Sequence, residues 1–118
     1  MKWLLAIALV ASAGAQDSPA VHKSDETGIT MPRATKQVKA DYTEEAKANR
    51  IEGRVGLSVV VLETGSVGDV TVEQSLDSVY GLDRNAIAAM KQWEFKPGMK
   101  DGKAVAVRVR VEMTFWLK

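Results

Sequence analysis

The sequence predicts an α+β domain: a three-stranded antiparallel sheet, one long helix packed on a face of that sheet, and a short helix before the first strand. Three observations lead to this prediction. The stretch AVAVRVRVEMTFWLK at 104–118 alternates apolar and polar residues almost without a break, which is typical of a strand with one buried face. The stretch 53–76 holds two more apolar runs around the turn sequence ETGS. Between them, GLDRNAIAAMKQWEFKPG at 81–98 places apolar residues at helical spacing.

The short helix is expected over about 43–51. Asp41 and Glu44 have the spacing of a capping box, and Thr43 is an alternative N-cap. Gly53 stands where the residue after a helix C-terminus often adopts a left-handed conformation. The chain would then pass directly into the first strand.

The hairpin at 53–76 supplies the first two strands. Apolar residues at 55, 57, 59 and 61 share one face of the first strand. Val60 and Leu62 make its other face partly apolar, which favours a central position in the sheet. Gly65 marks the turn, and Val70 and Val72 alternate with polar residues in the second strand.

The long helix begins near Asp83, a candidate N-cap, and is ended by Pro97 and Gly98. Its inward stripe consists of Leu82, Ala86, Met90 and Trp93. About 14 residues span roughly 21 Å at 1.5 Å each, enough to bring the chain back along the hairpin. The third strand then runs antiparallel to the first, which predicts the sheet order 2-1-3 with the long last strand on an edge.

The start of the chain is expected to lie outside this domain. MKWLLAIALVASAGAQ has a positive charge, an apolar run too short to cross a bilayer, and an A-x-A site, which predicts a signal peptide over 1–15 with cleavage after Ala15. Residues 16–37 are polar, unpatterned and carry two prolines, so we expect a flexible leader before a domain at 38–118. Export without a second hydrophobic segment predicts a periplasmic protein and makes inner-membrane anchoring the weaker alternative.

Composition and motifs argue against several classes of function. Removing Lys2 with the signal peptide lowers the formal net charge from +1 to 0, which gives no support to nucleic-acid binding. The chain has no cysteine, and His22, its one histidine, lies in the leader. No nucleophile with a base, no metal-ligand spacing and no phosphate-binding loop stands out. The sequence therefore predicts a non-enzymatic protein without a cofactor or metal.

The last strand carries most of the candidate partner-binding residues. An edge strand presents free N–H and C=O groups that can accept an added strand. Arg108, Arg110 and Glu112 either keep this edge soluble or set a charge preference for the partner. Trp116 has outward parity and is either a partner contact or a lid, whereas Trp93 is better explained as core than as part of an aromatic binding surface. The candidate set is Tyr42, Val107, Arg108, Val109, Arg110, Val111, Glu112, Thr114 and Trp116.

Several short motifs, in this order and at these spacings, resemble the TonB C-terminal domain over about residues 38–118. They are RIEG at 50–53, the turn residue Gly65, LD at 82–83, AI at 86–87, W-x-F-x-P at 93–97 and DGK at 101–103. The final strand, ending in TFWL, completes the pattern. One departure is Tyr42 followed by Thr43, where the family commonly has Tyr-Pro.

The resemblance implies a periplasmic domain that binds outer-membrane receptors in TonB-dependent transport. Such a domain recognises a short receptor segment, the TonB box, by adding it to the sheet as an extra strand. In the usual energy transducer, an inner-membrane helix and a Pro-rich spacer connect the domain to a proton-driven motor complex. Here the sequence predicts a signal peptide and has only three prolines, so it does not predict coupling to that motor. The alternative is a self-associating periplasmic domain that forms a homodimer through its edge and modulates a full-length transducer.

Overall fold

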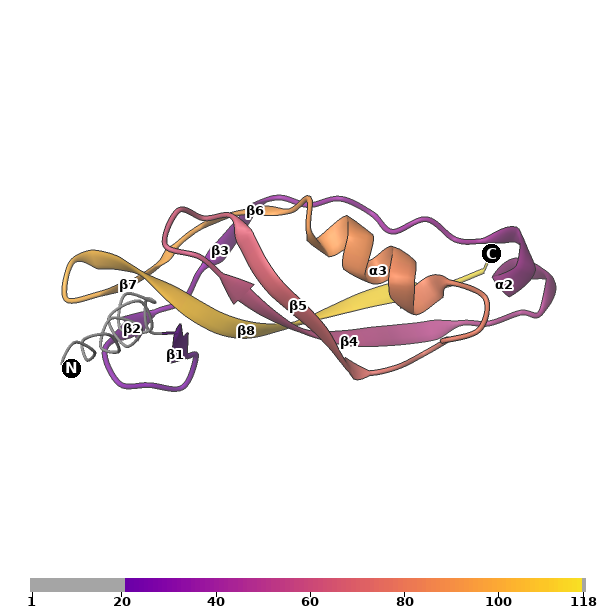
Figure 1. Ribbon diagram of the computed structural model, residues 1–118, viewed down its shortest axis with the longest axis horizontal. Coiled ribbons are helices and arrows are strands. Elements are labelled where there is room, and N and C mark those ends of the chain that lie inside the picture. The colour runs from indigo at the N-terminus through magenta and orange to yellow at the C-terminus, as the bar shows by residue number, and fades with distance from the viewer. Residues whose placement is uncertain (1–20, 118) are drawn as a thin grey trace, which may run out of the picture.

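Three long strands form the centre of the fold in a computed structural model that describes residues 21–117 (Figure 1). The signal peptide expected over 1–15 lies outside the described residues. In chain order the elements are β1 (Val21–Lys23), β2 (Ile29–Thr30), β3 (Arg33–Lys36), α2 (Glu44–Ala48), β4 (Gly53–Val61), β5 (Val67–Gln74), α3 (Leu82–Met90), β6 (Glu94–Lys96), β7 (Gly98–Lys100) and β8 (Lys103–Phe115).

The long strands have the order β5-β4-β8, and both pairings are antiparallel. The β4–β8 ladder runs without a register shift from Gly53 opposite Phe115 to Val61 opposite Val107. Every residue of β4 from Val55 onward is buried, because β4 has a strand on each side. The α+β class, the order 2-1-3 and the central place of the first long strand are therefore confirmed.

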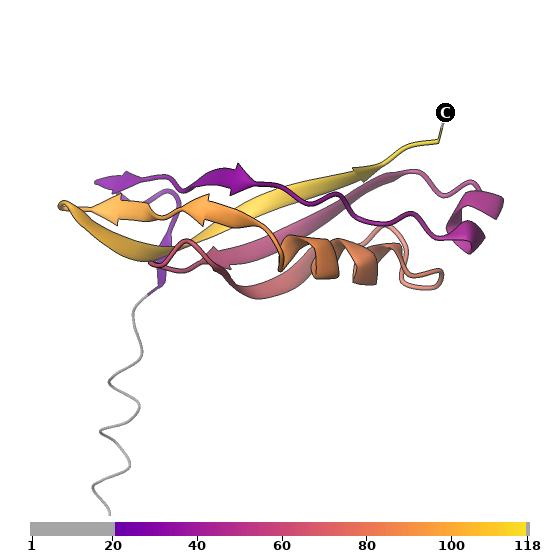
Figure 2. The same ribbon diagram turned by 90° about the horizontal axis from the view of Figure 1, so that it is seen from above.

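The number of strands differs from the prediction, because five short strands accompany the three long ones. β1 pairs parallel with β8, β2 pairs with β7, and β3 pairs with β6 in a small separate sheet. Figure 2 shows β2 and β3 running beside β7 and β6. Residues 21–36, expected to belong to an unpatterned leader, supply three of these strands. Strands of two to four residues pair through their backbones, so they leave no side-chain periodicity to detect.

α3 ends at Met90, whereas the sequence predicted a helix that continues to about residue 96. After Met90 the backbone N–H groups of Gln92 and Trp93 bond to carbonyls three residues back, which tightens the last turn. The chain then forms β6, and the N–H of Phe95 donates to the carbonyl of Gly65 at 2.9 Å. The helical spacing of apolar residues continues past Met90. The backbone nevertheless leaves the helix, because it bonds instead with the β4–β5 turn.

α2 is also shorter than expected, and its caps differ. Thr43, not Asp41, is the N-cap, with its Oγ1 accepting from the N–H of Ala46 at 3.1 Å. Arg50 directly follows the C-cap Asn49 and takes the left-handed conformation, with φ of 54°. Gly53 also has a positive φ, of 145°, but it is the first residue of β4. No helix within residues 21–117 combines the length and apolar character needed to cross a membrane.

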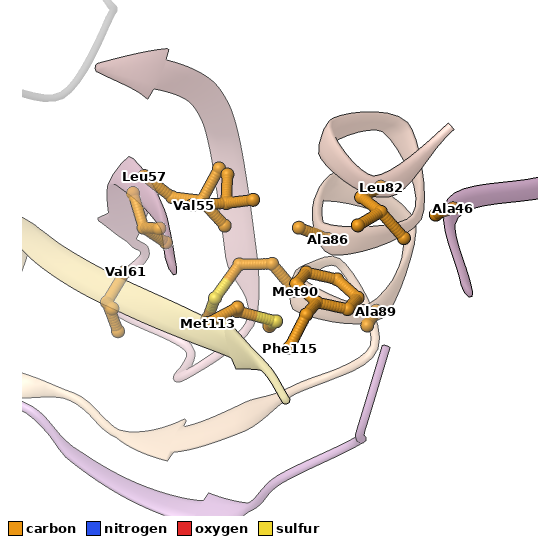
Figure 3. Packing of buried hydrophobic residues seen from close by; sticks show 11 residues of the cluster. Ala46, Val55, Leu57, Val61, Leu82, Ala86, Ala89, Met90, Met113 and Phe115 are labelled. Carbon is orange, nitrogen blue, oxygen red and sulfur yellow. The ribbon is translucent and has the colours of Figure 1, made fainter. Parts of the chain in front are cut away.

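The hydrophobic core lies between α3 and the face of the sheet that β4 and β8 present to it (Figure 3). α2 closes one end of this core through Ala46, which is fully buried. Trp93 packs against the same cluster and donates its indole N–H to the carbonyl of Val38 at 2.9 Å. The labelled core residues are Ala46, Val55, Leu57, Val61, Leu82, Ala86, Ala89, Met90, Met113 and Phe115.

Candidate docking edge

The two edges of β8 are occupied to different extents. β4 and β1 both pair with Val107 and Arg108, so they must lie on opposite edges of β8. β4 covers its edge as far as Phe115, whereas β1 covers the other edge only at Ala106–Arg108. Among the described residues, no strand pairs with Val109–Phe115 on the side away from β4. We call this stretch of backbone the open edge.

The direction of the backbone groups follows from the neighbouring hairpin. Leu62 donates its N–H to the carbonyl of Ser66 at 2.9 Å, toward β5. Successive residues of a strand direct their backbone groups to opposite sides, so Val61 faces β8 and bonds with its partner Val107. The odd-numbered residues of β8 from 107 to 115 therefore bond with β4. The N–H and C=O groups of residues 110, 112 and 114 face the open edge.

Grooves lie beside the open edge, where the chain at 37–42 passes the end of β8. One groove of about 400 Å³ is lined by residues that include Val38, Trp93 and Met113. A second, of about 440 Å³, is lined by residues that include Tyr42 and Trp116. Thr114 borders both grooves. An added strand would thus find hollows next to the backbone groups that bind it.

The charged residues of β8 lie across the sheet face opposite α3. Arg110 contacts the carboxylates of Glu73 at 2.8 Å and Glu112 at 3.4 Å. Its guanidinium lies over Gly56, where an added Cβ would be only 2.6 Å away. Arg108 donates to the hydroxyl of Ser58 at 3.0 Å. These groups are tied to β4 and β5, and exposed pairs of this kind each contribute little stability, about 0–1 kcal/mol.

Tyr42 and Trp116 sit differently at the far end of the open edge. The Tyr42 hydroxyl donates to the carbonyl of Ile51, and its ring meets Phe115 edge to face at a centroid distance of 5.5 Å. Burial, with a contribution from the charge of Glu52, raises the pKa of Tyr42. Trp116 follows the last residue of β8 and is 57% exposed. Tyr42 is therefore held in place by its contacts and lines the groove, whereas the largely exposed Trp116 lies at the border of the groove.

The remaining candidate residues divide into core and edge. Val107 is fully buried and is paired on both sides, so its side chain belongs to the core. Val109 and Val111 are half-buried against the core, and Thr114 is exposed. The sequence does not predict that β1 lies on this edge or that the chain at 37–42 forms the grooves. Neither segment has a periodic pattern that could have revealed its position.

Comparisons with known proteins identify the family of this chain. The family model described as "Gram-negative bacterial TonB protein C-terminal" matches residues 38–117. Protein TonB of Vibrio cholerae serotype O1 is 34% identical over 85 residues, which cover 70% of this chain and 33% of that protein. Protein TonB of Xanthomonas campestris pv. campestris is 39% identical over 67 residues, which cover 57% of this chain and 30% of that protein. The chain thus matches about a third of the length of these curated relatives.

The fold is similar to a solved structure as well. The solution NMR structure of the Pseudomonas aeruginosa TonB CTD aligns with a TM-score of 0.60 and 26% sequence identity. The alignment covers 81% of this chain and 93% of that one. Nearly all of the solved domain therefore has a counterpart here.

Proposed function

Because this chain belongs to the family of Gram-negative TonB C-terminal domains, we propose that it binds a segment of an outer-membrane receptor by strand addition, in TonB-dependent transport. The open edge is the observation that carries this proposal, because Val109–Phe115 has no strand partner on that side among residues 21–117. The partner would be an extended peptide such as the TonB box. The role is binding and not catalysis.

The backbone supplies part of the binding energy. Residues 110, 112 and 114 each offer one N–H and one C=O to an incoming strand. Six hydrogen bonds at about 0.5–1.5 kcal/mol net each give about 3–9 kcal/mol. The loss of translational and rotational freedom on binding costs about 4–15 kcal/mol, before the ordering of the peptide is counted, so the backbone alone does not account for specific binding. The side-chain grooves would supply the rest. Alternate residues of the peptide would enter the hollows beside Trp93 and Tyr42, and we expect those residues to be apolar.

The proposal places the domain in the periplasm, with a signal peptide at 1–15, a leader at 16–37 and the binding domain at 38–118. An intact mass that begins at Gln16, measured on protein from the periplasmic fraction, would support this division. A membrane-bound product that retains Met1 would contradict it. Coupling to an inner-membrane motor complex is not part of the proposal.

Proline substitution tests the edge directly, because proline removes one backbone N–H. Glu112→Pro removes an outward N–H and should abolish binding of a synthetic TonB-box peptide while leaving most of the stability. Val111→Pro removes an N–H that bonds with β4, and should cost about 3 kcal/mol or more, by analogy with other interior prolines. Glu112→Ala is the control for loss of the Glu112 side chain and should still bind.

The measurements are peptide titration by fluorescence and unfolding in urea. If Glu112→Pro and Val111→Pro both have the unfolding free energy of the parent in urea and both still bind the peptide, β8 is not the docking edge. If Glu112→Ala loses as much binding as Glu112→Pro, the side chain and not the backbone recognises the peptide.

The alternative is self-association through the same open edge, in a homodimer that modulates a full-length transducer. Two copies could pair their Val109–Phe115 stretches, because an unpaired edge accepts any compatible strand. Sedimentation of the peptide-free protein separates the two functions. A dimer that dissociates in the Glu112→Pro variant would favour self-association, and a monomer would favour receptor binding.

A further inference from the structure

β1 occupies the beginning of the same edge that we assign to the receptor peptide. Its residues pair in register with β8, with Val21 opposite Ala106 and Lys23 opposite Arg108. The open edge begins at the next residue, Val109. The side of β8 away from β4 is therefore one continuous edge from Ala106 to Phe115, and a segment of the chain itself fills its first three positions.

A carboxylate closes the turn that follows β1 and ties this turn to β7. Glu26 accepts a hydrogen bond from His22 Nδ1 at 3.0 Å and one from the backbone N–H of Lys23 at 2.9 Å. Lys100 on β7 approaches the same carboxylate at 3.6 Å. The two hydrogen bonds, and to a lesser extent the nearby charges, lower the pKa of Glu26 from 4.5 to about 2. Glu26 thus acts as a clamp on the turn after β1, and its contact with Lys100 joins that turn to β7.

Little else fixes β1 to the domain. Val21 is 44% exposed and does not belong to the hydrophobic cluster of the core. The next strand, β2, has its own partner in β7, with Ile29 opposite Lys100. Gly28, between β1 and β2, has φ of +85°, and a Cβ added there would meet no atom within 4 Å. β1 could therefore leave β8 by motion at residues 24–28 while β2 stays paired.

We propose that β1 is an internal competitor for the docking edge, an inference that rests on the proposed function. While β1 is docked, an incoming strand can pair only from Val109 onward. Release of β1 extends the available edge back to Ala106 and lets a longer peptide bind. Because β1 is tethered, its local concentration is high, of the order of millimolar for a short linker. A peptide that needs the whole edge then binds more weakly, by the fraction of molecules in which β1 is released.

Two opposite variants of the full chain test this proposal. Glu26→Gln weakens the clamp, and Asp25→Asn removes the same charge from the neighbouring residue as its control. Val21→Cys with Ala106→Cys places two thiols at registered positions, where a disulfide would lock β1 onto β8. The chain has no cysteine of its own, so the reduced form of this variant is an internal control for the oxidised form.

Two labelled peptides serve as probes. The first is a synthetic TonB-box peptide long enough to pair with ten residues. Glu26→Gln should bind it about three- to tenfold more tightly than the parent, the ratio expected when a docked competitor leaves about 10–30% of molecules open. Asp25→Asn should bind like the parent, and the oxidised disulfide form should bind more weakly than its reduced form. The second probe is the chain's own segment 18–27, SPAVHKSDET, which should bind Glu26→Gln but not the oxidised form.

The outcomes separate this inference from the proposed function. Equal binding of the TonB-box peptide to all variants would overturn the competition and leave receptor docking intact. Binding of the 18–27 peptide alone, in the expected order, would support the internal competitor and contradict receptor docking. If neither peptide binds any variant, the edge accepts no added strand and both are overturned.

Discussion

Two buried carboxylates fix the start of α3. Asp83, which the sequence indicated as the N-cap, instead points back to the preceding loop and accepts from the N–H groups of Leu76 and Asp77, each at 3.0 Å. Asp77 accepts from the N–H of Leu82, the first residue of α3, at 3.1 Å. It also accepts from Val79 and Tyr80, at 2.9 and 2.8 Å. Asp77, which lies outside the helix, thus accepts the hydrogen bond from the first N–H of α3. The sequence predicts this capping role for Asp83.

Asp77→Asn should therefore destabilise the fold in a pH-dependent way. Burial raises the pKa of Asp77, but hydrogen bonds from Tyr80, Leu82 and Val79, with the charge of Arg84, outweigh it and hold the pKa below its usual 3.8. A carboxylate with a lowered folded-state pKa stabilises the protein above its unfolded pKa, and this stabilisation is lost as the pH falls through the folded value. We expect a loss of about 1–3 kcal/mol at neutral pH.

Urea unfolding of the parent and of Asp77→Asn, at pH 7 and at about pH 3, measures this effect. The difference in unfolding free energy between the two proteins should shrink at the lower pH. A difference that stays constant would mean that the charge of Asp77 plays no part.

At the scale of elements, the β4–β5 turn positions the chain that follows α3. Gly65 has φ of +89°, and its carbonyl accepts the N–H of Phe95. A Cβ on Gly65 would lie 2.2 Å from the carbonyl oxygen of Phe95. This oxygen belongs to the backbone, so it cannot move aside as the end of a flexible side chain can. This turn therefore has both a conformational and a steric need for glycine.

Gly65→Ala should destabilise the fold more than Gly102→Ala does. Gly102 in the β7–β8 turn has a similar φ of +77° but open space around it, so it reports the backbone strain alone. That strain is about 1–2 kcal/mol. Gly65→Ala should add a further loss of about 1–3 kcal/mol from the displaced β6, the range seen when overpacking forces the backbone to shift. Equal unfolding free energies for the two variants would show that β6 moves away freely.

The same elements show what the sequence could and could not predict. β4, β5 and β8 were found because each is long enough for alternation to identify it, and the buried run of β4 indicated its central position. β1, β2 and β3 are too short to show a period, and each is fixed by a partner far along the chain. The edge position of β8 followed from the order of elements. The part of that edge covered by β1 depends on tertiary pairing, which no local pattern encodes.

At the scale of the whole molecule, β8 connects nearly every part of the structure. It pairs with β1, β4 and β7, and its Met113 and Phe115 enter the core under α3. The extension formed by β2, β3, β6 and β7 reaches the three long strands through the β7–β8 hairpin and through contacts of β6 with the β4–β5 turn. Loss of β8 should therefore disrupt both sheets.

A chain stopped after Gly102 should aggregate on refolding instead of forming a partly folded monomer. It would retain the β4–β5 hairpin but leave the buried sequence VGLSVVV of β4 as an unpaired edge. Light scattering after dilution from urea, at about 10 μM protein, measures this. Addition of a peptide with the sequence of residues 103–118 should suppress the scattering. A truncated chain that stays clear and monomeric would contradict the prediction.

The long β4–β8 ladder also sets the order in which the protein can fold. Its partners are 46 residues apart at Val61 and Val107 and 62 apart at Gly53 and Phe115, so a long loop must close before the ladder forms. β8 follows every other described strand. During synthesis from the N-terminus, one side of β4 therefore stays unpaired until β8 has been made. β8 thus completes the fold by strand addition to the uncovered edge of β4. Once it is in place, the uncovered edge is the side of β8 that lies away from β4.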